Sequence, residues 1–294
     1  TPGHKVPDRS MATASAAHGR VFPGPSAGPC DELIDEFSAV VGAAHVLLDD
    51  DVRAGYEIDW TGRYQGRSSA VVRPRTTEEV AAVVQACARH GISVVPQAGN
   101  SGLVGGGVPR PVAPDEEPPI LLSLARLMQL GPVDTAALHV TAGAGVTLTS
   151  WRQHARDAGL DTPVDFAARD VATIGGAIAT NAGGSRVIRF GTMRQQVVGI
   201  EAVTADGSIV GSLSGLPKET AGVHWPSLLA GSEGTLAIIT AARLRLVPWM
   251  RETITALVAV ESITAATQLL AELRQTVPSL DAIELIYPAA MALV

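Results

Sequence analysis

The alternation of apolar and polar positions predicts a series of helices and strands from residue 31 onward. Apolar residues recur at helical spacing over 31–41 and 77–90, and Gly91 is a typical stop for the second helix. The strand, helix and strand expected over 70–95 form a β-α-β unit, an arrangement that places ligands beyond the strand ends. Short β-type apolar runs predict strands over 70–74, 92–95, 120–124 and 138–142.

The second half of the chain continues this mixed pattern. Residues 148–158 predict a helix that closes at Gly159. Two β-type runs, 198–205 and 209–213, flank Asp206-Gly207 and predict a hairpin. Further along, the pattern predicts a strand, a helix and a strand over 252–260, 264–273 and 280–286.

A glycine loop follows the predicted strand 92–95. Five glycines fall within the nine residues from Gly99 to Gly107, so the backbone N–H groups there are left uncovered by side chains. Successive uncovered N–H groups form concave nests that hold phosphate oxygens. A tight turn or a flexible linker would show a similar cluster of glycines. Because apolar runs enter and leave the loop, we favour a phosphate-binding loop built into a core.

Two further clusters of small residues occur later in the chain. Residues 172–185 carry Gly, Ala or Thr at most positions, and such a segment lets a flat ligand lie directly on the backbone. Thr173, Thr180 and Asn181 supply polar groups there, although close packing of a helix on a strand would also select small residues. Residues 231–234, Gly-Ser-Glu-Gly, fit either a third ligand contact or an ordinary turn.

Composition narrows the choice of ligand. The chain has 294 residues, 46% of them hydrophobic and 17% charged, which is enough to bury a sizeable core. Its formal net charge is -7, and no Lys/Arg block stands out, which argues against nucleic acid or an anionic membrane surface as a partner. No apolar run approaches the roughly 18 to 20 residues of a membrane span. We therefore expect a small-molecule ligand.

The spacing of the cysteines and histidines predicts no metal site, disulfide framework or catalytic base. Cys30 and Cys87 have no metal-ligand spacing and suggest no disulfide framework, which favours a reducing, cytoplasmic compartment. The seven histidines lack the spacing of a metal site or a catalytic base, so we expect no metal and identify no catalytic residue. Residues 1–29 are rich in Pro, Gly, Ala and Ser and predict a disordered tail or residues left from an expression vector.

Taken in order, these segments resemble the FAD-binding half of the FAD-linked oxidase superfamily, the vanillyl-alcohol oxidase type with a PCMH-type FAD-binding domain. Within it the sequence is most similar to the branch of D-2-hydroxyglutarate dehydrogenases, D-lactate dehydrogenases and the glycolate oxidase flavin subunit. The resemblance extends over roughly residues 45 to 294. Its motifs are Asp59-Trp60, Val72-Arg73-Pro74-Arg75-Thr76-Thr77-Glu78-Glu79-Val80, Val95-Pro96-Gln97-Ala98-Gly99-Asn100-Ser101-Gly102, Ile174-Gly175-Gly176, Ala179-Thr180-Asn181-Ala182-Gly183-Gly184 and Gly231-Ser232-Glu233-Gly234-Thr235-Leu236.

The resemblance implies an FAD site made by all three clusters. The first cluster would hold the pyrophosphate, the second would line the flavin and the ribityl chain, and the third would approach the adenine or ribose end, with Glu233 fixing its loop. The implied cofactor-binding residues are Pro96, Gly99, Asn100, Ser101, Gly102, Leu103, Pro163, Asp165, Thr173, Gly175, Gly176, Thr180, Asn181, Gly183, Gly184, Glu233, Gly234, Ile238 and Ile239.

One amide residue of the implied site and three positively charged residues near it carry separate predictions. Some relatives tether the flavin through a histidine in the first loop, where this chain has Asn100, so we expect FAD to bind non-covalently. For Arg186 and Arg189 we favour a solvated or phosphate-facing role over contact with substrate. Lys218 is a weaker candidate for a contact near the flavin.

The resemblance also implies a fold and a reaction. The fold would be α+β, with two subdomains around FAD over residues 30–250 and the beginning of a truncated α+β cap domain over 251–294. The reaction would be oxidation of a 2-hydroxy acid, such as D-2-hydroxyglutarate, D-lactate or glycolate, by hydride transfer to flavin N5. The electron acceptor could be a quinone, an electron-transfer protein or oxygen.

Two other functions stay open at this point. The chain could be a flavin-carrying subunit that passes electrons to a partner chain, as in molybdenum hydroxylases. A non-catalytic nucleotide-binding protein is the weaker alternative, because the Gly-Lys-Ser/Thr ending of a P-loop is absent. The sequence leaves open whether the chain forms a homodimer.

Overall fold

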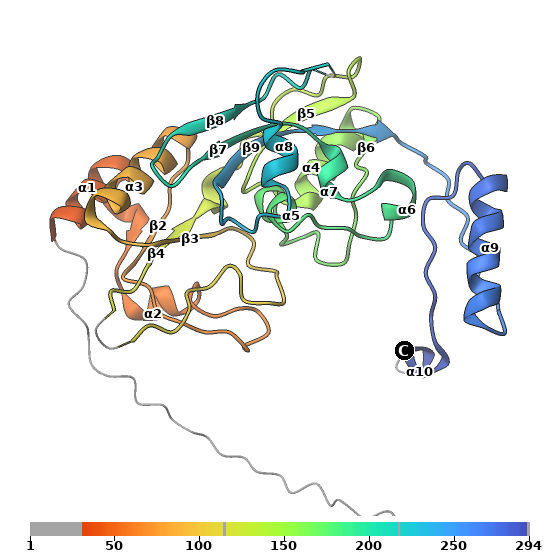
Figure 1. Ribbon diagram of the computed structural model, residues 1–294, viewed down its shortest axis with the longest axis horizontal. Helices are drawn as coiled ribbons and strands as arrows, with labels where there is room; N and C mark the ends of the chain where they lie inside the picture. The colour runs from red at the N-terminus through yellow and green to blue at the C-terminus, as the bar shows by residue number, and fades with distance from the viewer. Residues whose placement is uncertain (1–30, 114–115, 217, 293–294) are drawn as a thin grey trace, which may run out of the picture.

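A computed structural model describes residues 31–113, 116–216 and 218–292, so the predicted tail and Cys30 lie outside the described residues. Within these ranges the chain builds two four-stranded sheets with helices packed on them (Figure 1). The strand order is β1-β2-β4-β3 in the first sheet and β5-β9-β7-β8 in the second. The mixture of helices and sheets confirms the expected α+β class.

The first sheet forms from β1 (Val46–Leu47), β2 (Ala70–Val72), β4 (Ile120–Ser123) and β3 (Val94–Gln97). Strands β2, β4 and β3 run parallel, and β1 is antiparallel to β2. Helices α1 (Asp31–Val41) and α3 (Thr77–His90) bury their apolar faces in the same core as this sheet. The side chain of Thr76 caps α3 by accepting from the Glu79 amide at 3.2 Å, and Gly91 ends it at φ 68°.

The second sheet is antiparallel throughout and contains β5 (His139–Gly143), β9 (Ile238–Arg245), β7 (Val197–Val203) and β8 (Ile209–Ser212). Trp151 of α4 (Leu148–Asp157) and Ile174 of α5 (Ile174–Ala179) are buried in its core. The predicted hairpin is confirmed, since β7 and β8 pair across the Asp206-Gly207 turn. The carboxylate of Asp206 accepts from the Thr204 and Ser208 hydroxyls and the Ser208 amide, which lowers its pKa to about 2.

The other elements lie outside the two four-stranded sheets. Strands β6 (Leu160–Asp161) and β10 (Val247–Pro248) pair with each other, apart from both four-stranded sheets. The remaining elements are η1 (Ala43–His45), α2 (Asp50–Ala54), η2 (Leu124–Arg126), α6 (Val187–Phe190), α7 (Met193–Gln196), α8 (Trp225–Leu229), α9 (Ile263–Thr276) and α10 (Pro288–Met291).

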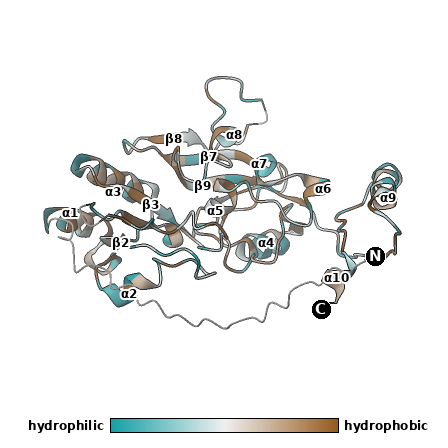
Figure 2. Ribbon diagram, turned by 60° about the horizontal axis from the view of Figure 1, so that its bottom comes forward, coloured by the Kyte–Doolittle hydropathy of each residue, from teal (hydrophilic) through white to brown (hydrophobic). Residues whose placement is uncertain are grey.

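The C-terminal part of the chain corrects two predictions. The helix expected over 264–273 is present as α9, but the strands expected over 252–260 and 280–286 are not formed. A strand needs a neighbour for its N–H and C=O groups, and no described strand pairs with either segment. Figures 1 and 2 both show α9 standing apart from the body that contains the sheets.

The thiol of Cys87 provides a direct test of the core around α3. Burial in that core raises the pKa of Cys87 to about 12, so the thiol stays neutral at ordinary pH. In a Cys30→Ser background, we expect Ellman's reagent to modify Cys87 at least about 100-fold more slowly in buffer than in guanidinium chloride. Equal rates in the two solvents would contradict the packing of α3.

Candidate functional site

The structure brings the three clusters of small residues together at one place. We call them the glycine loop (96–107), the small-residue segment (171–184) and the Gly-Ser-Glu-Gly turn (231–234). The glycine loop begins at the end of β3, in the first sheet, whereas the turn leads into β9 of the second. The candidate site therefore lies where the two sheets meet.

The small-residue segment contacts both of the other clusters through its backbone. A Cβ atom built on Gly99 would lie 2.1 Å from the carbonyl oxygen of Val171, so the loop and the segment touch backbone to backbone. On the other side, the Glu233 amide donates to the Ala179 carbonyl at 2.9 Å. These contacts fix the segment between the loop and the turn.

The loop and the turn also meet each other. A Cβ atom on Gly234 would lie 3.0 Å from Cγ of Pro96. Arg194 links the small-residue segment to the turn. Its backbone amide donates to Oδ1 of Asn181 at 3.0 Å, and its guanidinium donates to the carbonyl of Ala230, next to the turn, at 2.6 Å. The three clusters are thus in contact in all three pairs.

Strained backbone is concentrated in the same place. Asn100, Asn181 and Glu233 have φ values of 45°, 50° and 52°, one residue in each cluster. Leu138 is the other non-glycine residue with positive φ in the described chain. The left-handed conformation costs most residues with a side chain roughly 1–2 kcal/mol, although Asn adopts it more readily, so Glu233 carries the clearest strain of the three clusters. Strain of this kind gathers at ligand clamps and active sites, which makes the three clusters a candidate functional site.

The glycines of the site divide into two groups. Gly175 is needed for packing, because a Cβ there would lie 2.7 Å from Cβ of Ala144, and Gly184 would meet the Asp165 carbonyl oxygen at 2.2 Å. For these glycines and for Gly99, close packing accounts for the missing side chain. By contrast, a Cβ on Gly102 meets nothing within 4 Å. The packing of the protein itself therefore does not require glycine at position 102.

Two hydroxyl groups at the site have no partner. Oγ1 of Thr173 and Oγ of Ser232 are buried and make no hydrogen bond within the described residues. An unpaired buried polar atom costs about 1–3 kcal/mol, and a bound molecule can remove that cost. Both hydroxyls can donate to the oxygens of a phosphate or accept from a sugar-like chain. The site therefore fits a nucleotide-type cofactor.

Other predicted site residues shape the loops or the core. The Asn100 amide donates to the Ile58 carbonyl at 2.9 Å, and Oγ1 of Thr180 donates to the Gly176 carbonyl at 2.9 Å. Ile238 and Ile239 are buried in β9. The remaining predicted residues divide by exposure: Pro163 is buried, Ser101 and Gly183 are half-buried, and Leu103 is exposed.

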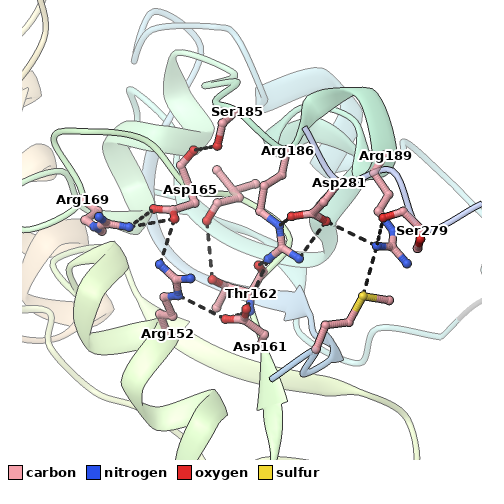
Figure 3. Close-up of polar contacts among 12 residues, drawn as sticks. Arg152, Asp161, Thr162, Asp165, Arg169, Ser185, Arg186, Arg189, Ser279 and Asp281 are labelled. Carbon is pink, nitrogen blue, oxygen red and sulfur yellow. Dashed lines mark hydrogen bonds and ion pairs between the residues drawn. The ribbon is translucent and has the colours of Figure 1, made fainter. Parts of the chain in front are cut away.

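Sequence reasoning missed a network of ion pairs beside the site (Figure 3). Asp165 accepts from Arg152 at 2.8 Å and from Arg169 at 2.7 Å, so it is engaged by cations instead of being free for a ligand. Asp161 accepts from Arg152 at 3.2 Å and from Arg186 at 3.4 Å. The available signal was the set of arginines near two aspartates in 152–186, but their pairing depends on the fold.

The structure also corrects the expectation of a solvated Arg186. This side chain is buried, with 8% of the residue exposed, and it binds Asp281 with two nitrogens at 2.8 and 3.1 Å. Arg189 reaches the same carboxylate at 3.5 Å. Lys218 is exposed. The two arginines therefore hold a carboxylate of the chain itself.

A pocket of about 400 Å³ lies next to the small-residue segment. Asp165 and Gly184, both predicted to bind the cofactor, form part of its wall. Arg169, Ser185 and Glu284 supply further polar groups to the same wall. A small polar molecule could therefore bind beside the candidate cofactor site.

The described residues show no other obvious centre. Within them, no group of three or more His, Cys, Asp or Glu side chains is placed to hold a metal ion. Of the helices that the structure describes, none is both long and apolar enough to cross a membrane.

Comparison with known proteins agrees with this geometry. Residues 68–212 match the FAD binding domain family. Over 236 residues the chain is 36% identical to a probable mitochondrial D-2-hydroxyglutarate dehydrogenase of Oryza sativa subsp. indica, covering 80% of this chain and 41% of the relative. It is 43% identical over 193 residues to D-2-hydroxyglutarate dehydrogenase of Xanthomonas citri pv. viticola, covering 65% and 39%. The chain thus spans about two fifths of the length of these relatives.

Solved structures show the same fold. A structure of alkyldihydroxyacetonephosphate synthase superimposes with a TM-score of 0.70 at 21% identity, covering 86% of this chain and 47% of that one. A structure of p-cresol methylhydroxylase gives a TM-score of 0.62 at 20% identity, covering 76% and 44%. The arrangement of the two sheets is therefore shared with these proteins.

The expected cytoplasmic location is wrong by the same comparison. The relatives from Oryza sativa, Bos taurus, Danio rerio and Rattus norvegicus are all named as mitochondrial. A low cysteine content indicates a reducing environment, but it does not identify the compartment.

The family match, the relatives and the shared fold confirm the resemblance carried by the three clusters, and with it FAD as the cofactor. Residues 68–212 of the chain belong to the FAD-linked oxidase family as its FAD binding domain.

Proposed function

We propose that the three clusters hold FAD without a covalent bond, and that the protein oxidises a 2-hydroxy acid. The observation that carries the proposal is the meeting of the clusters around open backbone at Gly102 and two unpaired hydroxyls, on Thr173 and Ser232. The open N–H groups after Gly99 suit the pyrophosphate, and the hydroxyls suit oxygens elsewhere in the cofactor. Relatives named as D-2-hydroxyglutarate dehydrogenases support the substrate class.

The residues of the site contribute mainly position and shape. The backbone contacts of Gly99 and Gly184 hold the loop and the segment in fixed places, so the open N–H groups are already oriented before a ligand binds. Asn100 holds the loop to Ile58 through its amide, which is not a nucleophile, and this supports non-covalent binding. A bound flavin supplies a ring that can accept a hydride from a substrate carbon.

The pocket beside the small-residue segment is our candidate for the substrate. Its wall offers the Ser185 hydroxyl and the Arg169 guanidinium, whose charge is shared with Asp165 at 2.7 Å. A hydroxy acid carries hydroxyl and carboxylate groups that such a wall can bind.

Cofactor loading and reduction test the proposal. We expect purified protein to be yellow, or to become yellow with added FAD, and to release free FAD into the supernatant on acid precipitation. We also expect D-2-hydroxyglutarate, D-lactate or glycolate to bleach the flavin band of the full-length protein under anaerobic conditions. Protein that stays colourless with added FAD would overturn the cofactor site. Flavin that stays with the precipitate would overturn non-covalent binding, and a band that no hydroxy acid bleaches would overturn the substrate class.

A further inference from the structure

The C-terminal part of the chain is held to the body with almost no apolar burial. None of residues 251–292 is buried, and Ile254 and Leu257 are 95% and 82% exposed. Burial of apolar surface contributes roughly 25 cal/mol per Å², so it supplies little of the attachment here. The polar contacts of this part must therefore decide where it lies.

Those contacts converge on one carboxylate. Asp281 accepts from Nε and Nη2 of Arg186 at 2.8 and 3.1 Å and from Nη1 of Arg189 at 3.5 Å. Arg189 also donates to the Ser279 carbonyl at 3.2 Å. Figure 3 shows both guanidinium groups pointing toward the same side chain. Two nitrogens of one guanidinium on one carboxylate give direction as well as attraction.

The two arginines are already in place for this role. Both guanidinium groups lie over the Phe190 ring, at 4.7 and 5.0 Å from its centre. Arg186 is further fixed by donating to the Thr162 carbonyl and to Asp161. A buried and oriented guanidinium loses little conformational freedom when it binds a carboxylate.

The ion-pair network around Asp281 carries an excess of positive charge. In the part of the network that the structure describes, the arginines outnumber the aspartates by five to three, so the loss of Asp281 would leave a larger excess of positive charge at a buried position. The five arginines are Arg152, Arg156, Arg169, Arg186 and Arg189, and the three aspartates are Asp161, Asp165 and Asp281.

The position of Asp281 also determines the pocket. Glu284 follows three residues later and forms part of the pocket wall together with Asp165 and Arg169. A shift of Asp281 away from the arginines would carry Glu284 with it. The position of Glu284 in the pocket wall thus depends on the contacts that Arg186 and Arg189 make with Asp281 and Ser279.

We propose that Arg186 and Arg189 form a carboxylate seat for Asp281, and that this contact holds residues 277–287 as a strap over the pocket. The strap is closed when Asp281 occupies the seat and opens when the contact is broken. The attraction is electrostatic and only part-buried, so salt weakens it. The proposal concerns the placement of the strap and does not depend on FAD or on the substrate.

Distances between two spin labels test the strap in the full chain. One label is placed at Ala271→Cys on α9 and the other at Gln153→Cys on α4, in a Cys30→Ser background, because both positions are exposed and Cys87 is buried. We expect a narrow distance distribution in the parent and one about twofold broader or more in Asp281→Asn. Asp281→Glu should restore much of the narrow distribution because it keeps the charge.

Glu272→Gln is the matched control, since it removes one exposed carboxylate of α9 that makes no ion pair within the described residues. Its distribution should stay narrow. Equal widths in Asp281→Asn and the parent would overturn the proposal. If Asp281→Asn does not fold, salt decides the matter in the parent: raising NaCl from about 0.05 M to about 1 M should broaden the distribution, and no change would overturn the strap.

Discussion

The Gly102→Glu variant is expected to lose FAD binding by at least about 100-fold, or about 2.7 kcal/mol, while its thermal stability stays unchanged. A Cβ at this position meets nothing within 4 Å, and the backbone there is not in the left-handed region, so the fold accommodates a side chain. The new carboxylate would lie where we place the pyrophosphate and would repel it. Titration of apoprotein with FAD, followed by flavin fluorescence, measures the effect.

Gly55→Glu is the matched control for this variant. Gly55 is exposed at the end of α2 and has a φ of -68°. The Gly55→Glu substitution adds the same negative charge at a position outside the three clusters. Its affinity for FAD should equal that of the parent protein. If Gly102→Glu binds FAD as well as the control does, the glycine loop does not hold the pyrophosphate.

The Gly184→Ala variant is expected to lose about 3 kcal/mol of unfolding free energy, which lowers the melting temperature by roughly 6–12 °C. Two effects combine at this position. Its φ of 131° lies in a region that residues with a side chain rarely adopt, and the new Cβ would lie 2.2 Å from the Asp165 carbonyl oxygen. Because that oxygen belongs to the backbone, it cannot rotate away. Urea denaturation followed by circular dichroism measures the loss.

The neighbouring glycine serves as its control. A Cβ on Gly183 would meet only Cγ2 of Val187, at 3.2 Å, and a side-chain methyl group can shift. We expect Gly183→Ala to cost less than about 1 kcal/mol. Similar losses in both variants would show that the contact with Asp165 is not what selects glycine at 184.

Local signals were sufficient for the longer helices α1 and α3, whereas the short helices α2, α6, α7 and α8 were not predicted. The bounds of α1 and α3 agree with the predicted ranges 31–41 and 77–90, because a helix makes its hydrogen bonds within its own segment and ends at residues such as Gly91. The β7–β8 hairpin was predictable for the same reason, since its turn lies in the sequence between its strands. The order of strands within each sheet has no such local signal.

The failures follow from non-local requirements. Residues 252–260 have a β-type composition, yet a strand forms only beside a partner, and composition does not supply one. The sequence pattern identified the clusters that contain the site glycines. It could not distinguish Gly102, which faces open space, from Gly175, which packs on Ala144. The contact between Arg186 and Asp281 joins residues 95 positions apart, and no sequence motif indicates it. The boundary proposed near residue 250 also stays a prediction.

The position of the site between the two sheets has a consequence for cohesion. The glycine loop extends from the first sheet, and the small-residue segment and the turn belong to the second, so a molecule bound to all three acts as a clasp between them. Binding of this molecule then stabilises the two sheets against separation, because separating them releases it. A substitution far from the clusters can loosen the packing between the two sheets. Its first measurable effect would therefore be faster dissociation of the cofactor.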